Sequence, residues 1–197
     1  MTRIIAGTAA GRRLSVPKED VRPTTDRVRE ALFSSLSHTR GSLSGDRVLD
    51  LYAGTGALGL EALSRGARHL VAVERSPATA AALRRNVDVL RDCLASNVTV
   101  DVIRADVLAW LSRVAQAPFD VVFADPPYGV STEEVERVLS DLISGGLLSA
   151  GADVVIERGR RDRPMQWPAP LQQRDTRRYG DTTLWYGRAQ SHPEPTP

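Results

Sequence analysis

The tetrapeptide Asp125-Pro126-Pro127-Tyr128 places hydrogen-bond acceptors in a rigid backbone. Two successive prolines fix the chain and remove two N–H donors, so their carbonyls are firmly held acceptors. Asp125 and the Pro126 carbonyl could each accept one hydrogen of a base's exocyclic amine, and Tyr128 could stack on the flipped base. The pattern favours methylation of that amine, with Asp125, Pro126 and Tyr128 as catalytic residues. The structural alternative is a proline-rich turn capped by Asp125 and covered by Tyr128.

A glycine-rich segment from Asp50 to Gly59 could bind the methyl donor. Gly54, Gly56 and Gly59 form a G-x-G-x-x-G pattern, which allows a tight turn and a close approach of a ligand to the backbone. Glu74 follows Gly54 by twenty residues, at the end of the next predicted strand, where a carboxylate can accept from ribose hydroxyls. These features fit a dinucleotide as well as they fit S-adenosylmethionine.

Two further carboxylates favour S-adenosylmethionine. Asp50 would repel a pyrophosphate but could help to neutralise an ammonium or sulfonium group, and Asp106 could accept from an adenine amino group. The structural alternatives are a carboxylate bonded to loop amides for Asp50 and a helix N-cap for Asp106. We therefore expect S-adenosylmethionine as the cofactor, and no metal. The predicted cofactor-binding residues are Asp50, Ala53, Gly54, Gly56, Glu74, Asp106 and Val107.

Strand and helix patterns alternate through the centre of the chain, and these elements must position the two motifs. Predicted strands cover residues 47–51, 69–74, 98–104, 119–124 and 153–157, with predicted helices over 26–36, 58–65, 77–90, 107–113 and 131–143. The alternation predicts an α/β, Rossmann-like class I methyltransferase fold with a mostly parallel, doubly wound sheet. Because the carboxyl ends of such strands line the ligand crevice, we expect the tetrapeptide to face the cofactor.

The two ends of the chain differ from this centre. Residues 1–24 hold short β-prone stretches broken by glycine and proline, which predicts a small N-terminal β-hairpin appendage that contacts RNA. Residues 172–179 and 182–188 predict an antiparallel hairpin that ends the sheet, as in methyltransferases. The predicted domains are the appendage 1–24, a methyltransferase domain 25–188 and a disordered tail 189–197.

Composition is typical of a globular protein, with 42% hydrophobic and 25% charged residues among 197. No apolar run approaches the ~20 residues of a membrane span, and the apolar stretch after Met1 is too short for a signal peptide. Cys93 is the only cysteine, which excludes a disulfide framework and a cysteine-based metal cluster. We expect a cytoplasmic monomer that contacts no membrane.

Basic residues gather toward both ends of the chain. Residues 1–30 hold seven basic and four acidic side chains, and residues 157–188 hold eight and four. This distribution predicts a binding surface for a polyanion, although a solvated surface with segregated charges would look the same. Lys18 is the only lysine; arginine suits phosphate and base contacts, but a composition bias of the genome would also produce the pattern.

With these motifs in view, the sequence resembles the RsmD family of bacterial methyltransferases, which act on the N2 amino group of a guanine in 16S rRNA. The segments that carry the resemblance are Arg3–Gly7, Gly11–Leu14, Arg22–Glu30, Asp50–Gly59, Asp125–Tyr128 and Arg178–Thr182. The resemblance implies that Asp50, Gly54, Gly56, Glu74 and Asp106 contact the cofactor and that Asp125 and Tyr128 address the base. It also implies 16S rRNA within an assembling or assembled small ribosomal subunit as the partner.

Arginines are the candidates for substrate binding. The predicted set is Arg12, Arg13, Arg22, Arg27, Arg29 and Arg178. Arg22, Arg27 and Arg29 could close over the cofactor or contact RNA, or they could form an ordinary basic helix face.

Four other functions compete with rRNA guanine methylation. An adenine-N6 methyltransferase shares the tetrapeptide but normally needs a larger target-recognition region, and a protein glutamine methyltransferase typically has asparagine in place of Asp125. A nicotinamide-dependent oxidoreductase would leave the tetrapeptide without a role. A non-catalytic RNA-binding protein would leave both motifs without one.

Overall fold

The computed structural model describes residues 2–17 and 25–190, and the chain divides into two compact units, residues 1–107 and 108–197. Arg22 and residues 191–197 of the predicted tail lie outside the described residues. Within the described ranges, no helix has the length and apolar character needed to cross a membrane.

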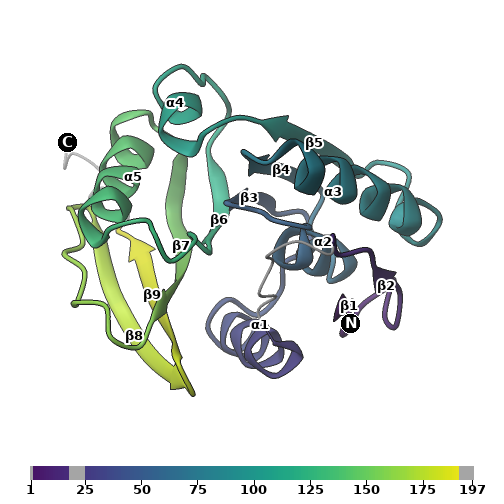
Figure 1. Ribbon diagram of the computed structural model, residues 1–197, viewed down its shortest axis with the longest axis horizontal. Coiled ribbons are helices and arrows are strands. Elements are labelled where there is room, and N and C mark those ends of the chain that lie inside the picture. The colour runs from purple at the N-terminus through teal and green to yellow at the C-terminus, as the bar shows by residue number, and fades with distance from the viewer. Residues whose placement is uncertain (1, 18–24, 191–197) are drawn as a thin grey trace, which may run out of the picture. The chain divides into compact units, whose positions relative to one another are not determined.

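The first unit contains a parallel sheet whose strands alternate with helices (Figure 1). Its strand order is β5-β4-β3, and both neighbouring pairs are parallel. The elements are β1 (Thr2–Arg3), β2 (Arg13–Leu14), α1 (Asp26–Arg40), β3 (Arg47–Leu51), α2 (Ala57–Ser64), β4 (His69–Glu74), α3 (Pro77–Leu90), the 3-10 helix η1 (Arg91–Cys93) and β5 (Thr99–Arg104). Strands β3 and β4 are buried along most of their length, as expected for parallel strands covered on both faces.

Capping residues set the helix boundaries of this unit. Thr25 accepts from the Val28 N–H at the start of α1, and Ser76 accepts from the Thr79 N–H before α3. Helix α1 continues about one turn past its predicted end and stops at Gly41, whose φ is 84°. The apolar periodicity ends earlier because residues 37–39, in the last turn, are exposed.

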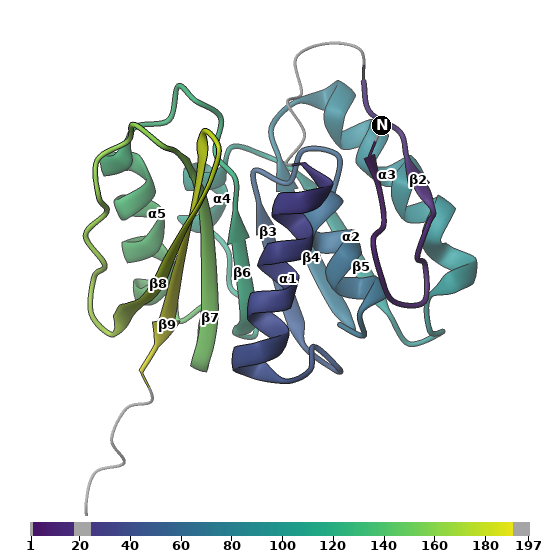
Figure 2. The ribbon, with the colours of Figure 1, turned by 90° about the horizontal axis from the view of Figure 1, so that it is seen from below.

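Buried side chains of α2 anchor the β1–β2 hairpin, which lies beside α2 and α3 (Figure 2). The Glu61 carboxylate is fully buried and accepts from the N–H groups of Ile5 at 2.7 Å and Ala6 at 3.0 Å. The Ser64 hydroxyl accepts from the Ala9 N–H at 2.9 Å and donates to the Ala6 carbonyl at 2.6 Å. The predicted hairpin is therefore present, and its irregular backbone is hydrogen-bonded to the helix that follows the glycine-rich segment.

The second unit combines one parallel strand pair with an antiparallel hairpin, in the order β6-β7-β9-β8. Its elements are β6 (Phe119–Ala124), α5 (Thr132–Ser144), β7 (Leu148–Gly159), β8 (Leu171–Tyr179) and β9 (Thr182–Ala189), and α4 (Val107–Leu111) begins at the boundary of the units. The predicted terminal hairpin is confirmed. Strand β7 is longer than predicted because its ends pair with Phe119 and Thr182, partners that the local pattern does not reveal.

An exposed ionic cluster fixes the segment between β7 and β8. Arg163 binds Glu133 of α5 at 2.7 Å and Glu136 at 2.9 Å, and the Gln166 N–H donates to Glu136 at 2.7 Å. Hydrogen bonds from its own backbone N–H and from Arg163 lower the pKa of Glu133 to about 2, so the cluster stays charged at neutral pH. Its solvent exposure limits the gain in stability.

Gly7→Ala is expected to destabilise the hairpin. Gly7 has a φ of 85°, and a Cβ there would lie 1.8 Å from the Ser64 carbonyl oxygen. Overpacking of this kind typically costs ~1–3 kcal/mol, in addition to the ~1–2 kcal/mol that a left-handed conformation costs alanine. The free energy of unfolding from urea titration measures the sum.

Gly11→Ala is the matched control. Its φ is 81°, but a Cβ there would meet nothing within 4 Å in the described part of the chain. Only the conformational cost should remain, so equal destabilisation by the two substitutions would contradict the proposed packing of Gly7 on α2.

Candidate cofactor and base sites

The turn after β3 uses left-handed backbone at three positions, Tyr52, Gly54 and Gly56, with φ values of 57°, 56° and 84°. A Cβ on Gly56 would lie 2.1 Å from a methyl carbon of Leu83, and the left-handed φ there also favours glycine. At Gly54 the nearest atom to such a Cβ would be the Tyr52 carbonyl oxygen at 4.0 Å. The backbone at Gly54 therefore has room beside it, as a ligand-binding turn requires.

Glu74 supports this turn from the end of β4. One carboxylate oxygen accepts from the Gly54 N–H at 2.9 Å, and the other accepts from the Ser76 N–H at 2.7 Å. A carboxylate offers about four lone-pair positions, and these two bonds leave acceptor capacity for hydroxyl groups. Glu74 is half-buried at the carboxyl end of β4, so a ligand could still reach its carboxylate.

Asp50 is almost completely buried, with 1% of its surface exposed. Its Oδ2 accepts from the Gly59 N–H at 2.9 Å. A Cβ on Gly59 would lie 2.6 Å from a methyl carbon of Leu70 and 3.0 Å from this same Oδ2, so the position is tightly packed. The structural role considered for Asp50, a carboxylate bonded to amides of this segment, is thus observed. A contact with the cofactor stays a prediction.

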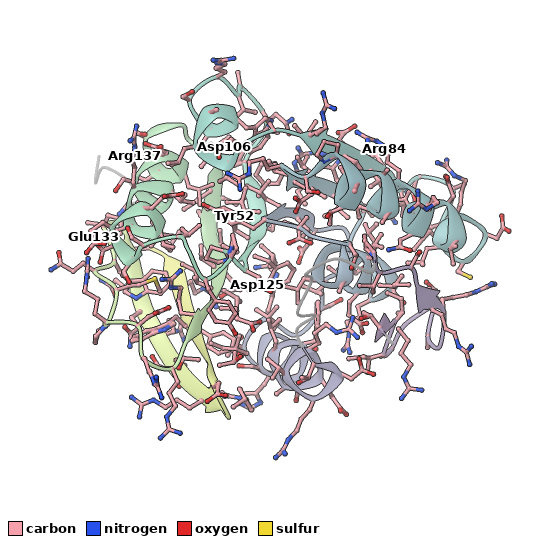
Figure 3. The ribbon with its side chains drawn as sticks, viewed as in Figure 1. Tyr52, Arg84, Asp106, Asp125, Glu133 and Arg137 are labelled. Atoms are coloured by element: carbon pink, nitrogen blue, oxygen red, sulfur yellow. The ribbon has the colours of Figure 1, made fainter. Side chains whose placement is uncertain are left out.

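The remaining cofactor candidates follow strands of the same unit. Ala53 lies in the turn, where its N–H donates to the Val73 carbonyl at 3.0 Å. Asp106 is exposed and precedes α4 (Figure 3), in line with its alternative role as an N-cap. The next residue, Val107, is buried. The first unit thus contains every predicted cofactor residue: Asp50 within β3, Ala53, Gly54 and Gly56 in the turn after it, Glu74 at the end of β4, and Asp106 and Val107 just after β5.

Asn86 is a buried residue of this region that sequence analysis did not identify. Its side chain in α3 accepts from the Ser15 N–H at 2.7 Å and donates to the Ser15 carbonyl at 3.1 Å and the Thr55 carbonyl at 2.9 Å. It is fully buried. Asn86 therefore joins the chain just after β2 to the glycine-rich turn. An asparagine in the helix interior, where this residue type has low propensity, was the available signal.

In the second unit, the tetrapeptide begins directly after β6 (Figure 3). Pro126 is buried, Asp125 is half-buried, and Tyr128 is 74% exposed. The Val130 N–H donates to the Pro127 carbonyl at 2.9 Å and closes a turn. A ring that covered the core would be largely buried. The exposure of Tyr128 therefore favours a stacking surface over the alternative role as a cover.

A small pocket of about 30 Å³ lies against this turn. It is lined by Pro126, Tyr128, Glu157, Arg158, Gly159, Asp162 and Thr182. Arg158 is almost fully buried; its Nη2 donates to the Val130 carbonyl at 2.9 Å, and its Nε lies 3.0 Å from Asp162. Arg158 thus ties the turn to β7 and builds one wall of the pocket.

The predicted substrate arginines differ in exposure. Arg12, Arg13, Arg27 and Arg178 are exposed, whereas Arg29 is fully buried. The Arg29 Nη2 donates at 2.7 Å to the Arg3 carbonyl and at 2.7 Å to Asp26. Because it is buried, Arg29 cannot belong to an exposed basic helix face. Its bond to the Arg3 carbonyl joins α1 to β1 instead.

Comparison with known proteins identifies close relatives of this chain. A family model described as Conserved hypothetical protein 95 matches residues 2–188. The ribosomal RNA small subunit methyltransferase D of Buchnera aphidicola is 37% identical over 126 residues, 64% of this chain and 62% of that protein. The protein of that name from Haemophilus influenzae is 36% identical over 168 residues, 84% of this chain and 82% of that protein.

A solved structure shares the fold. The putative methyltransferase yhhF from Escherichia coli matches with a TM-score of 0.81 at 30% identity, over 97% of this chain and 99% of that chain. This likeness confirms the predicted class I methyltransferase fold.

Asn86→Ala is expected to destabilise the first unit and loosen the glycine-rich turn. The substitution removes three hydrogen bonds and leaves the buried Thr55 carbonyl without the amide donor, at a cost of ~1–3 kcal/mol for an unsatisfied buried group. Hydrogen exchange of the Gly54 and Gly56 amides should accelerate. Asn97→Ala, at an exposed position, is the control; equal exchange in the two variants would contradict this role.

Proposed function

The chain belongs to the RsmD family of methyltransferases, and on that basis we propose that it methylates the N2 amino group of a guanine in 16S rRNA, using S-adenosylmethionine. The observation that carries the proposal is the position of Asp125, buried Pro126 and exposed Tyr128 at the end of a parallel strand. The names of the curated relatives supply the small-subunit rRNA substrate. Membership of this family argues against a nicotinamide-dependent oxidoreductase.

The first unit offers groups that fit S-adenosylmethionine. The Glu74 carboxylate is held by two backbone amides and retains acceptor capacity for the two ribose hydroxyls. The open backbone at Gly54 provides room, and exposed Asp106 can accept from the adenine amino group. When bound, the cofactor supplies an electrophilic methyl group on a sulfonium. Ala53, Gly56 and Val107 would line its binding site.

The second unit offers groups that orient an amine. The lone pair of an exocyclic amine is delocalised into the ring, so the amine is a poor nucleophile. Asp125 and the Pro126 carbonyl would each accept one N–H, directing the lone pair out of the ring plane toward the methyl carbon. After transfer the cationic amine loses its extra proton readily, and no strong general base is needed.

Tyr128 would hold the target base. Its ring is largely exposed, and stacking on an aromatic side chain is worth ~1–3 kcal/mol per base. Pro126 shares the wall of the same pocket, so a base stacked on Tyr128 would have its edge near the Pro126 carbonyl. The base must leave its own stack to reach this position.

Substrate RNA would be bound by exposed arginines. Arg12 and Arg13 lie in the hairpin that Glu61 and Ser64 anchor, and Arg178 lies on β8. We propose that these residues and Arg27 contact rRNA phosphates, within an assembling or assembled small subunit. A monomer in the cytoplasm is the form we propose to be active.

Asp125→Ala should abolish methyl transfer to purified small ribosomal subunits, because one of the two amine acceptors is lost. Binding of S-adenosylmethionine, measured by calorimetry, should stay within ~3-fold of wild type, since a loss of ~0.6 kcal/mol or less is expected from a residue outside the cofactor site. Asp141→Ala, which removes an acidic residue of α5, is the matched control and should keep full activity.

Mass mapping of the rRNA product identifies the modified base. N2-methylguanine in 16S rRNA is the expected product. Full turnover by Asp125→Ala would refute the proposed role of Asp125. If the product were N6-methyladenine, the target base would be adenine and the proposed guanine specificity would be wrong.

Arg12→Gln combined with Arg13→Gln should weaken RNA binding and flatten its salt dependence. Each lost phosphate contact lowers the slope of log K against log salt by ~0.7–0.9, so the pair should lower it by up to ~1.8. Titrations at several salt concentrations measure the slope. Arg85→Gln combined with Arg104→Gln removes two exposed arginines of the same unit as a control. An unchanged slope in the hairpin variant would exclude these phosphate contacts.

A further inference from the structure

The pocket beside the tetrapeptide presents a carboxylate that the proposed chemistry does not use. Ala124 pairs with Ile156 where β6 and β7 run parallel, so Asp125 and Glu157 follow at the same level of the two strands. Glu157 lines the pocket together with Pro126 and Tyr128. Three residues that could meet a base are thus gathered at one end of one strand pair.

Other polar groups of the pocket are engaged in building it. Arg158 binds Asp162 and the Val130 carbonyl, and Asp162 also accepts from the Gly159 N–H at 3.0 Å. Thr182 donates its hydroxyl to the Glu157 Oε1 at 3.3 Å. This bond orients the Glu157 carboxylate from β9. A carboxylate can accept about four hydrogen bonds, and Glu157 forms part of the pocket wall, where the edge of a base could donate to it.

The exocyclic amines of guanine and adenine have different neighbours on the base edge. In guanine the N2 amine lies next to the N1–H, a donor, whereas in adenine the N6 amine lies next to N1, an acceptor. A carboxylate beside the amine site would bind the guanine N1–H and would repel the adenine N1 lone pair. Only an edge of the base needs to enter, which suits the small volume of the pocket.

We propose that Glu157 is the residue that selects guanine, by accepting the N1–H while Asp125 and the Pro126 carbonyl accept from N2. This inference rests on the proposed function, since it assumes that the amine is bound at the tetrapeptide. Thr182 is a positioning residue, because it acts on the base only through Glu157.

The test compares guanine with 2-aminopurine at the modified position of 16S rRNA, in subunits reconstituted with the substituted RNA. 2-Aminopurine keeps the amine at position 2 but has an acceptor at N1. Wild type should favour guanine in kcat/KM by ~10–100-fold, the effect of a lost charged hydrogen bond. Glu157→Gln can turn its amide N–H toward an acceptor, so the preference should fall to within ~3-fold.

Glu134→Gln, the same change on the first turn of α5, is the matched control and should keep the wild-type preference. Glu157→Gln should unfold in urea at the same midpoint as wild type, which reports a folded second unit, where Glu157 lies. If Glu157→Gln does not fold, Thr182→Val replaces it, and its preference should fall at least ~3-fold because the carboxylate is less well oriented.

If wild type had equal kcat/KM values for guanine and 2-aminopurine, this result alone would overturn the role of Glu157, and no variant would be needed. A preference unchanged in Glu157→Gln, or in Thr182→Val when that variant replaces it, would overturn the role as well. These outcomes differ from failure of the proposed function, in which wild type would methylate no guanine of 16S rRNA.

Discussion

The turn that follows β3 depends on acceptors for backbone amides that no regular element can pair. Left-handed residues and a helix start leave N–H groups there without strand or helix partners. Buried or half-buried side chains accept from them: Asp50 from the Gly59 N–H, and Glu74 from the Gly54 N–H. The other oxygen of Glu74 accepts from the Ser76 N–H, just after β4. These two carboxylates, together with the bond from Asn86 to the Thr55 carbonyl, stabilise the shape of the turn and hence any ligand site on it.

The N-terminal hairpin follows the same rule. Its strands are only two residues long. Glu61 and Ser64 accept from backbone N–H groups of the loop between the strands, and Asn86 binds Ser15 just after the hairpin. Polar groups buried without partners would be costly, so these three side chains define one docked position. The exposed arginines Arg12 and Arg13 are thereby presented on a fixed frame.

Local patterns in the sequence were sufficient to predict the order of strands and helices, the glycine-rich turn and the terminal hairpin. Helix caps at Thr25 and Ser76 involve residues within a few positions of each other. The roles of Glu61 and Asn86 could not be predicted, because their partners lie 31 to 71 residues away. Burial of Arg29 was also missed, since its charge suggests an exposed helix face. The pocket around Glu157 needed the pairing of β6, β7 and β9, which no local pattern reveals.

The bond network of Asn86 has a thermodynamic consequence. One amide group bonds both to Ser15, just after the hairpin, and to Thr55 in the glycine-rich turn. A ligand that displaced the hairpin would strain or break the bond to the turn, and a ligand that tightened the turn would favour the docked hairpin. Coupling of this kind is reciprocal: each ligand alters the affinity for the other by the same factor. The order in which two such ligands arrive would then change the path of assembly but not the final free energy.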